Sequence, residues 1–215
     1  MNNNMTNVRG KAKVYDNAKV LENAQLFGNA YITDNVQLFG NAKVHGNVKI
    51  CDDAKVFGNA NIYGNVEIYD NVTLSGNIQV YDNVTLCGNA KVYGNARIWN
   101  NSYITNNAQV YGNAKITGDT IISNNAKVYG NAELYGNLTK INDNAEVYGN
   151  AIIEDSEILG NTKVYGNAKI YDYCGINNII VCGNAYLLNT NINTNNLSIM
   201  PIIICGKARL KKFFM

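Results

Sequence analysis

The chain has 215 residues, 47% of them hydrophobic, and its 18 Lys and Arg against 16 Asp and Glu leave a net charge of +2. This length and composition fit one domain with a substantial core. The near-neutral charge excludes the basic excess of a dedicated nucleic-acid-binding protein, so we expect no nucleic-acid partner.

The N-terminal segment and the cysteines bear on localisation. The first residues, MNNNMTNVRGKAKV, lack the apolar stretch of a signal peptide, and no segment approaches the roughly 18 apolar residues that span a bilayer. The five cysteines occur without a CxxC motif or a Cys/His cluster, which favours reduced thiols over a disulfide framework or a zinc site. These features predict a cytoplasmic protein with no membrane partner and no bound metal.

A six-residue repeat begins at Ala12 and continues without a slip to Leu138. In the copy AKVYGN, which starts at Ala90, apolar and polar residues alternate over four positions and then meet Gly-Asn, which predicts a short strand followed by a corner. Period two places Ala90 and Val92 on one side and Lys91 and Tyr93 on the other. Gly and Asn suit a corner that requires positive φ, and Gly-Asn in every sixth position disfavours a helix.

Strands this short bury their apolar side only if each lies in register on its copy from another turn of the chain. Three hexads per turn predict an all-β fold, a single-stranded, triangular parallel β-helix with about 18 residues per coil and about 11 to 12 coils. At a strand spacing of about 4.8 Å the stack is roughly 50 to 55 Å long. Asn over Asn at each corner predicts amide ladders.

The hexad pattern Val/Ile-x-Gly/Asp-Asn-Ala/Val-x resembles the hexapeptide repeat of left-handed parallel β-helix proteins, whose best-known members are trimeric acyl- and acetyltransferases. It is still more similar to the long NAxVYG arrays of bacterial proteins that are labelled as transferases. The resemblance covers about residues 8 to 190 and implies a left-handed coil, whereas the general preference for right-handed crossovers argues by itself for the opposite hand. Unlike the enzymes, which usually have Gly or Ala after the core Val, this chain mostly has Tyr, Phe or another large residue there.

Further along the chain the repeat is interrupted and then degrades. The interruptions are one residue gained at Thr139-Lys140-Ile141 and one residue lost in each of two places, between Ala151 and Ser156 and between Cys174 and Ile179. We interpret them as bulges or tightened corners. We divide the chain into a β-helix over residues 1–198 and a last irregular coil with a C-terminal cap over residues 199–215. The tail KKFFM covers the last coil or, alternatively, contacts a partner or a membrane.

Catalysis would depend on His45, the single histidine. The resemblance implies a His general base and an acyl-CoA or acyl-carrier thioester bound between subunits. His45 occupies a slot that elsewhere holds Tyr or Phe, with no inserted loop and no evident acid outside the repeat to orient it. We interpret it first as an aromatic-slot substitution, and we assign no catalytic residue and no cofactor. Acetyl-CoA or another acyl thioester is expected only if the chain is an enzyme.

Outward slots eighteen residues apart form two aromatic rows on neighbouring faces. The candidate binding residues of the first row and its cations are Phe39, Phe57, Tyr93, Tyr111, Tyr129, Lys55, Lys91 and Lys127, and those of the second row are Tyr63, Tyr81 and Trp99. The third face is much less aromatic. Exposed rows of rings suit an interface with another chain, while rings interleaved with Lys and Gln also suit an elongated glycan or polyanion. Tyr can also simply fit an exposed strand.

The leading hypothesis is therefore a non-catalytic rigid scaffold or binding surface that uses its aromatic rows and self-associates. The first alternative is an acyl-CoA-dependent acyl- or acetyltransferase of the hexapeptide-repeat family. The second alternative is a carbohydrate-binding module. The expected partners are a second copy of the chain or another protein, with a glycan as a further possibility.

Overall fold

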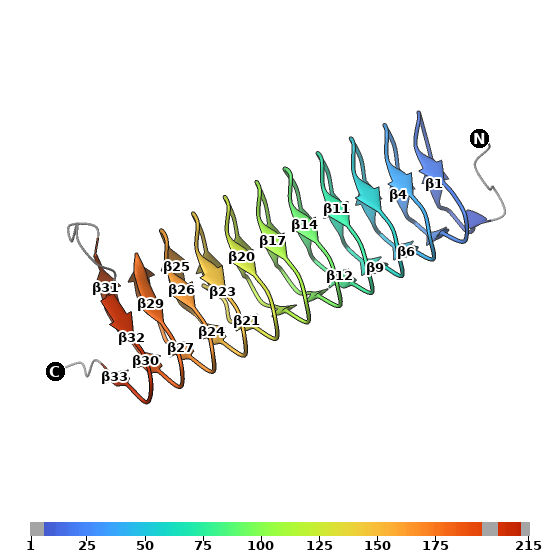
Figure 1. Ribbon diagram of the computed structural model, residues 1–215. Coiled ribbons are helices and arrows are strands. Elements are labelled where there is room, and N and C mark those ends of the chain that lie inside the picture. The colour runs from blue at the N-terminus through green and yellow to red at the C-terminus, as the bar shows by residue number, and fades with distance from the viewer. Residues whose placement is uncertain (1–6, 195–201, 212–215) are drawn as a thin grey trace.

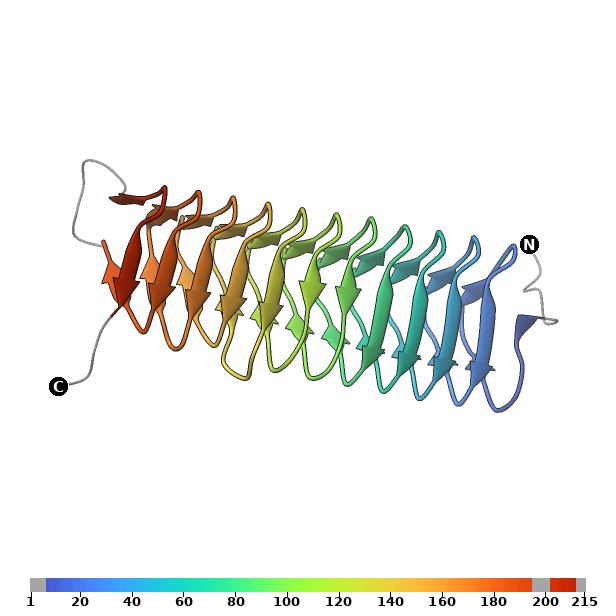
Figure 2. The same ribbon diagram turned by 90° about the horizontal axis from the view of Figure 1, so that it is seen from below.

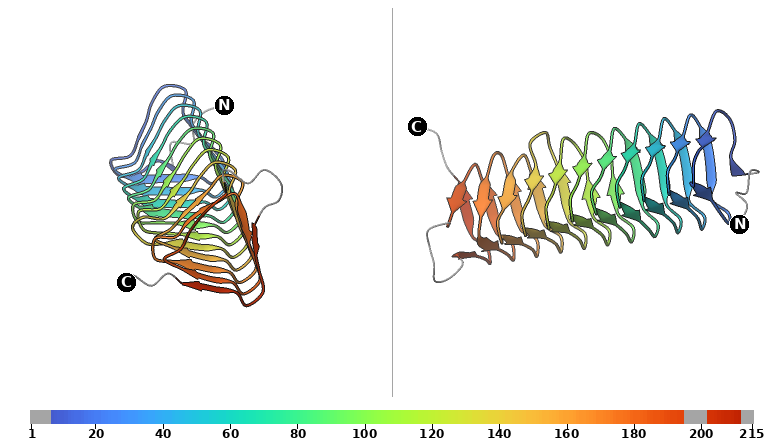
Figure 3. Two further views of the ribbon diagram at one scale, coloured as in Figure 1. Left: turned by 90° about the vertical axis from the view of Figure 1, so that its left-hand side faces the viewer. Right: turned by 90° about the horizontal axis from the view of Figure 1, so that it is seen from above.

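The chain winds into a stack of coils whose walls are three parallel β-sheets (Figure 1). The structure is a computed structural model and describes residues 7–194 and 202–211. Strands β1 and β33 lie at opposite ends of the stack, and successive coils lie side by side along its length (Figures 1 and 2). Seen from one end, the coils lie one behind another (Figure 3). No helix among the described residues is long and apolar enough to cross a membrane.

Each sheet takes every third strand of the chain. The first sheet consists of β1 (Lys13–Val14), β4 (Tyr31–Ile32), β7 (Lys49–Ile50), β10 (Glu67–Ile68), β13 (Thr85–Leu86), β16 (Tyr103–Ile104), β19 (Ile121–Ile122), β22 (Lys140–Ile141), β25 (Glu157–Leu159), β28 (Gly175–Asn177) and β31 (Asn191–Asn193). The second sheet consists of β2 (Lys19–Val20), β5 (Gln37–Leu38), β8 (Lys55–Val56), β11 (Thr73–Leu74), β14 (Lys91–Val92), β17 (Gln109–Val110), β20 (Lys127–Val128), β23 (Glu146–Val147), β26 (Lys163–Val164), β29 (Ile179–Val181) and β32 (Ile202–Ile204). The third sheet consists of β3 (Gln25–Gly28), β6 (Lys43–Gly46), β9 (Asn61–Gly64), β12 (Gln79–Asp82), β15 (Arg97–Ile98), β18 (Lys115–Ile116), β21 (Glu133–Tyr135), β24 (Ile152–Glu154), β27 (Lys169–Tyr171), β30 (Tyr186–Leu188) and β33 (Arg209–Lys211).

The register confirms the predicted coil. In the second sheet Lys91 pairs with Gln109 and Val92 with Val110, in parallel and eighteen residues on. Each sheet has 11 strands in the described residues, which agrees with the predicted 11 to 12 coils. Residues eighteen apart therefore lie directly over one another wherever the repeat is regular.

The core is the inside of the coil. Ala90 and Val92 are fully buried, Lys91 is exposed and Tyr93 is half-buried, as the alternation predicts. Some coils have a hydroxyl in place of the small apolar residue, and there it bonds to the backbone of the preceding corner. The Oγ1 of Thr120, for example, donates to the Thr117 carbonyl at 2.7 Å, so the buried oxygen keeps a hydrogen bond.

The corners explain the recurrence of Gly-Asn. Gly94 has φ 79°, and a Cβ added to it would lie 3.0 Å from both the amide nitrogen and the carbonyl oxygen of Gly112 in the next coil. Glycine meets both the backbone conformation and the close approach without strain. At the corner after the first sheet, Asp replaces Gly in several coils, and Asp52 has φ 61°.

The predicted amide ladders are present. We call the corner after the second sheet the second corner, and the ladder there the second-corner column. Each side-chain Nδ2 donates to the Oδ1 of the next coil at 2.7 to 3.2 Å. Its members are Asn23, Asn41, Asn59, Asn77, Asn95, Asn113, Asn131, Asn150, Asn167 and Asn184. Shorter columns occupy the other two corners.

The irregular laps keep the sheets in register because the extra or missing residue falls at a corner. Ile121 pairs with Lys140, nineteen residues on, and Lys140 pairs with Glu157, seventeen residues on. The gained residue leaves Leu138 with 49% of its surface exposed. The backbone amides of Asn137 and Leu138 both donate to one carboxylate oxygen of Asp155, at 2.6 and 3.1 Å.

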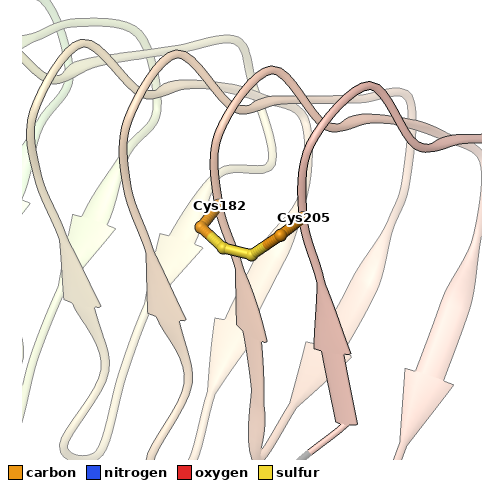
Figure 4. Close-up of a disulfide and its surroundings, with 2 residues drawn as sticks. All are labelled: Cys182 and Cys205. Carbon is orange, nitrogen blue, oxygen red and sulfur yellow. A yellow bond between two sulfur atoms is a disulfide. The ribbon is translucent and has the colours of Figure 1, made fainter.

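The C-terminal coil corrects one expectation. Cys182 and Cys205 are joined by a disulfide, with their Cα atoms 4.5 Å apart and a sequence separation of 23 (Figure 4). The expectation of five reduced thiols was wrong for this pair, because the longer last lap places Cys205 over Cys182 in the outward slot. Cys51, Cys87 and Cys174 are free.

The expected boundary between residues 198 and 199 falls outside the described residues. Beyond it, β32 pairs with β29 and β33 pairs with β30, so residues 202–211 continue two of the sheets. The cap expected at the end of the chain also falls outside the described residues, apart from Lys211 in β33.

Candidate functional site

The first aromatic row lies along the second sheet. Each of its rings immediately follows the buried core residue of a second-sheet strand, so the parallel register stacks the rings. Successive ring centroids from Tyr93 to Tyr165 lie 4.7, 4.7, 4.8 and 4.9 Å apart, with planes 2 to 8° from parallel. Two coils earlier, Phe39 and Phe57 stack at 4.9 Å and 6°. We call these rings the second-sheet ladder: Phe39, Phe57, Tyr93, Tyr111, Tyr129, Tyr148 and Tyr165.

The second aromatic row lies along the third sheet. Its centroids are 4.8, 5.1, 4.9 and 5.7 Å apart, with planes 2 to 7° from parallel. We call these rings the third-sheet ladder: Phe27, His45, Tyr63, Tyr81 and Trp99. The structure therefore stacks every ring among the candidate binding residues.

Stacking determines which part of each ring meets solvent. Within a ladder both faces of an inner ring are covered by its neighbours, and each ring is half-buried. The ladders therefore present ring edges and hydroxyls, the positive rim of the aromatic quadrupole. Open ring faces, which a glycan platform requires, are confined to ladder ends and gaps.

The candidate cations form a column beside the second-sheet ladder. Lys55 and Lys91 pair with Thr73 on either side, and Lys127 pairs with Gln109. Lys55 and Lys91 are exposed, while Lys127 is half-buried. The structure thus brings Lys and ladder rings onto one face of the second sheet, two residues apart along each strand.

Four tyrosine hydroxyls of the second-sheet ladder, those of Tyr93, Tyr111, Tyr129 and Tyr148, have a raised pKa. Burial raises the pKa of Tyr93, Tyr111 and Tyr148. Burial and then the Glu146 carboxylate raise the pKa of Tyr129, whose hydroxyl donates to Glu146 Oε2 at 3.2 Å. At neutral pH these four hydroxyls are therefore neutral hydrogen-bond donors.

His45 is a ladder ring, which agrees with the aromatic-slot interpretation. Its imidazole lies between Phe27 at 4.8 Å and Tyr63 at 5.1 Å, with planes within 6° of parallel. Desolvation lowers its pKa, which favours the neutral ring. None of the ion pairs among the described residues includes His45, so no such carboxylate orients it as a general base requires.

One group of side chains has the composition of a cation site. Ligand atoms of Asp34, Cys51 and Asp52 lie within 4.8 Å of one another. The two carboxylates, however, already accept backbone amides of the next coil, from Asp52 to Asp34 at 3.2 Å and from Asp70 to Asp52 at 2.9 Å. Burial and then the Asp52 carboxylate raise the pKa of the Cys51 thiol to about 11, so the protonated thiol is a poor metal ligand. We therefore assign the two carboxylates to hydrogen bonding between coils at this corner.

Sequence reasoning missed two rings at the far end of the second-sheet ladder and did not select Phe27 or His45 for binding. Tyr148 and Tyr165 lie beyond the first interruption, where counting by eighteen no longer lands on the aromatic slot. The tetrapeptide VYGN occurs at Tyr129, Tyr148 and Tyr165 alike, so a search for it would have found these two rings without counting residues along the chain.

One family comparison agrees with the β-solenoid architecture over a single short stretch of the chain. The family model described as YdcK beta solenoid repeat matches residues 108–124. A search of the curated proteins finds no match.

Two solved structures are similar in part. UDP-N-acetylglucosamine O-acyltransferase (LpxA) of Moraxella catarrhalis RH4 is 18% identical, with a TM-score of 0.36 over 81% of this chain and 70% of that one. UDP-N-acetylglucosamine acyltransferase of Francisella novicida is 16% identical, with a TM-score of 0.39 over 81% of this chain and 61% of that one. These values are too low for an inference about the activity of this chain.

Proposed function

We propose that the chain is a rigid, non-catalytic scaffold that binds a second copy of itself through its aromatic ladders. The observation that carries the proposal is the run of five tyrosines from Tyr93 to Tyr165, stacked at 4.7 to 4.9 Å on one outer face. The half-exposed edges of these rings form one contiguous aromatic row on the surface, and Tyr and Trp are enriched where proteins meet.

The period of the ladder favours a second copy as the partner. The ring edges of the ladder recur once in every coil. A partner surface with the same repeat distance can therefore contact every ring over several coils. Another β-helix of this kind has that distance, because strand spacing sets it. A net charge of only +2 adds little repulsion between two copies.

The test is the molar mass in solution over a range of concentrations, measured by light scattering and sedimentation. We expect an oligomer that dissociates when Tyr111→Ser and Tyr129→Ser are combined. The matched control is Tyr15→Ser, which removes an exposed tyrosine from the first sheet, where its ring contacts that of Tyr31 at a 39° tilt instead of stacking in a ladder. A wild-type protein that stays monomeric at high concentration contradicts the proposal.

An acyl-thioester-dependent acyltransferase is the second candidate function. The two similar solved structures are acyltransferases by name, and the feature of this chain that favours the candidate is the neutral imidazole of His45, with its lowered pKa. A neutral imidazole is the form that accepts a proton from an acceptor hydroxyl.

Two variants of His45 separate catalysis from packing. His45→Tyr restores a ring between Phe27 and Tyr63 and removes the base, whereas His45→Ala removes both. Acetyl-CoA binding by calorimetry and acetyl transfer by product analysis are measured for each. Transfer by the wild type that is lost in both variants establishes the enzyme, and absence of binding in the wild type favours the scaffold.

A further inference from the structure

The second-sheet ladder is interrupted by one coil, at Ser75. Strand β11 pairs in register with β8 before it and with β14 after it, so Ser75 occupies the slot between Phe57 and Tyr93. The backbone of this coil is held in the sheet, because the Ser75 amide donates to the Val92 carbonyl at 2.9 Å and the Phe57 amide to the Leu74 carbonyl at 3.0 Å. We call the space above Ser75, bounded by the Phe57 and Tyr93 rings, the Ser75 slot.

The width of the slot follows from the step of the ladder. Adjacent rings on either side stack at 4.9 Å and 4.7 Å, and two strand spacings place Phe57 and Tyr93 roughly 9.6 Å apart. One ring inserted midway would lie about 4.8 Å from each wall, which is the spacing that the ladder already adopts. The facing sides of Phe57 and Tyr93 are ring faces without an aromatic neighbour in the adjacent coil, so they are available for offset stacking.

Two cations stand beside the slot. Lys55 and Lys91 lie two residues before Phe57 and Tyr93 on the same strands, with Thr73 between them. Both lysines are exposed, and none of the ion pairs among the described residues includes either. An anionic group that extends from the slot to this column can therefore form ion pairs with both ammonium groups.

The gap beyond the third-sheet ladder has a different set of charges beside it. Thr117 separates Trp99 from Tyr135 there, but its hydroxyl already accepts the Nδ2 of Asn100 at 2.7 Å. In the neighbouring column Arg97 pairs in register with Lys115, and Lys115 forms an ion pair with Glu133 at 2.7 Å, so one of the two cations there is already neutralised. The two gaps are alike in their small residue and differ in charge, so the Thr117 gap is a matched control.

We propose that the Ser75 slot binds one planar aromatic ring that carries an anionic group. The ring lies between Phe57 and Tyr93, and the anion meets Lys55 and Lys91. This site does not depend on association through the ladders, since both walls and both cations belong to one chain.

The test uses the full chain and 2-naphthoate as the probe, titrated by calorimetry, with neutral 2-naphthamide as the comparison ligand. Ser75→Tyr supplies the missing ring from the chain itself and is expected to weaken 2-naphthoate binding by at least about tenfold, because the new ring occupies the space between both stacking walls. Thr117→Tyr is expected to leave binding within about twofold of the wild type, since it fills the other gap. Combining Lys55→Gln with Lys91→Gln is expected to reduce the preference for naphthoate over naphthamide to near unity.

Thermal unfolding shows that each variant folds, and Ser75→Tyr is expected to unfold at a higher temperature than the wild type because it completes the ladder. No binding of 2-naphthoate to the wild type at millimolar concentration overturns the proposal. Equal binding by the wild type and Ser75→Tyr also overturns it. Each titration is repeated at the protein concentrations used for the molar-mass measurements. A loss of self-association is then distinguished from a loss of ligand binding at the Ser75 slot.

Discussion

Tyr129 and Tyr148 stack with ring centroids 4.8 Å apart and planes 2° from parallel, although nineteen residues rather than eighteen separate them along the chain. The additional residue is accommodated at the corner that contains Leu138, while Lys127 still pairs with Glu146 and Val128 with Val147. The strand register, rather than the residue count, therefore keeps the ladder continuous.

Removing one inner ring should weaken the ladder on both sides. Tyr111 stacks on Tyr93 and Tyr129, each at 4.7 Å, and an aromatic pair is worth about 0.5–1.5 kcal/mol. We expect Tyr111→Ser to lower the free energy of unfolding by about 2 kcal/mol, measured by urea denaturation. Tyr111→Phe keeps the ring and should cost much less, and equal losses in the two variants would contradict a role for stacking.

A carboxylate inside an amide column should destabilise the coil in a pH-dependent way. Asn95 accepts from Asn77 and donates to Asn113, both at 3.0 Å. An ionised Asp at this position has no hydrogen-bond donor. We therefore expect Asn95→Asp to lower the free energy of unfolding by about 1–2 kcal/mol at pH 7.

The sign of that pH dependence follows from the missing donor. Protonation of the new carboxyl restores a donor, so its pKa in the folded state is raised above the unfolded value of about 3.9. The difference in stability from the wild type should therefore shrink as pH falls through the folded-state pKa. A constant difference between pH 7 and pH 4 would show that donation is not what the column requires.

The close approach of neighbouring coils should be measurable at glycine. An added Cβ meets backbone at 3.0 Å at Gly94 but nothing within 4 Å at Gly206, while φ is 79° and 78° at the two positions. Gly206→Ala should therefore lower the free energy of unfolding by about 1 kcal/mol, the cost of the left-handed backbone conformation alone. Gly94→Ala should lower it clearly more. Chemical denaturation gives both values, and equal costs would mean that the coils separate freely to admit the methyl group.

The Cys51 thiol should react slowly with alkylating reagents. Burial, followed by the Asp52 carboxylate, raises its pKa to about 11 from the usual 9.0. At pH 8 its thiolate fraction is then roughly a hundredfold below that of a thiol with the usual pKa. Iodoacetamide labelling of the Cys51 peptide, followed by mass spectrometry from pH 8 to 11, should show a rate that is still rising at pH 11. Asp52→Asn should shift the profile to lower pH, and an unchanged profile would assign the shift to burial alone.

Reduction of the Cys182–Cys205 disulfide should loosen only the last coil. The bond closes a loop with a sequence separation of 23, and a cross-link over such a loop stabilises by roughly 3 kcal/mol in the chain-entropy treatment. We expect Cys205→Ser to speed amide exchange in β32 and β33 and to leave β14 and β17 unchanged. Uniform loss of protection along the whole stack would show that the coils unfold as one unit.

Much of this architecture follows from local chemistry. The alternation around Ala90 and Val92 and the corner glycines predict strand length, core and lap, because each hexad is too short to be stable alone. The same logic places Phe39 over Phe57 and Tyr93 under Tyr111. It fails where laps change length, and so Tyr148, Tyr165 and the Cys182–Cys205 bond were not predicted.

Ring orientation was also beyond sequence reasoning. Residue spacing places side chains over one another, but the tilt that covers the ring faces arises from packing between neighbouring rings. Open ring faces of the kind that a sugar platform needs are therefore restricted to places such as Ser75, where a serine interrupts the row and leaves two faces without a stacked neighbour. The charge difference between that gap and the one at Thr117 depends on the Lys115–Glu133 ion pair, and the eighteen-residue lap already places these two residues over one another.

The second-corner column has a direction. From Asn23 to Asn184, every amide nitrogen donates toward the higher-numbered coil, so the side-chain dipoles point the same way and add instead of cancelling. The side chains of this column therefore form a polar chain along the corner. Their carbonyl oxygens point toward the coil of β1 and their amide nitrogens toward the C-terminal coils. Whatever extends it, whether a duplicated repeat or an abutting molecule, must arrive head to tail, since the reverse orientation would set donor against donor.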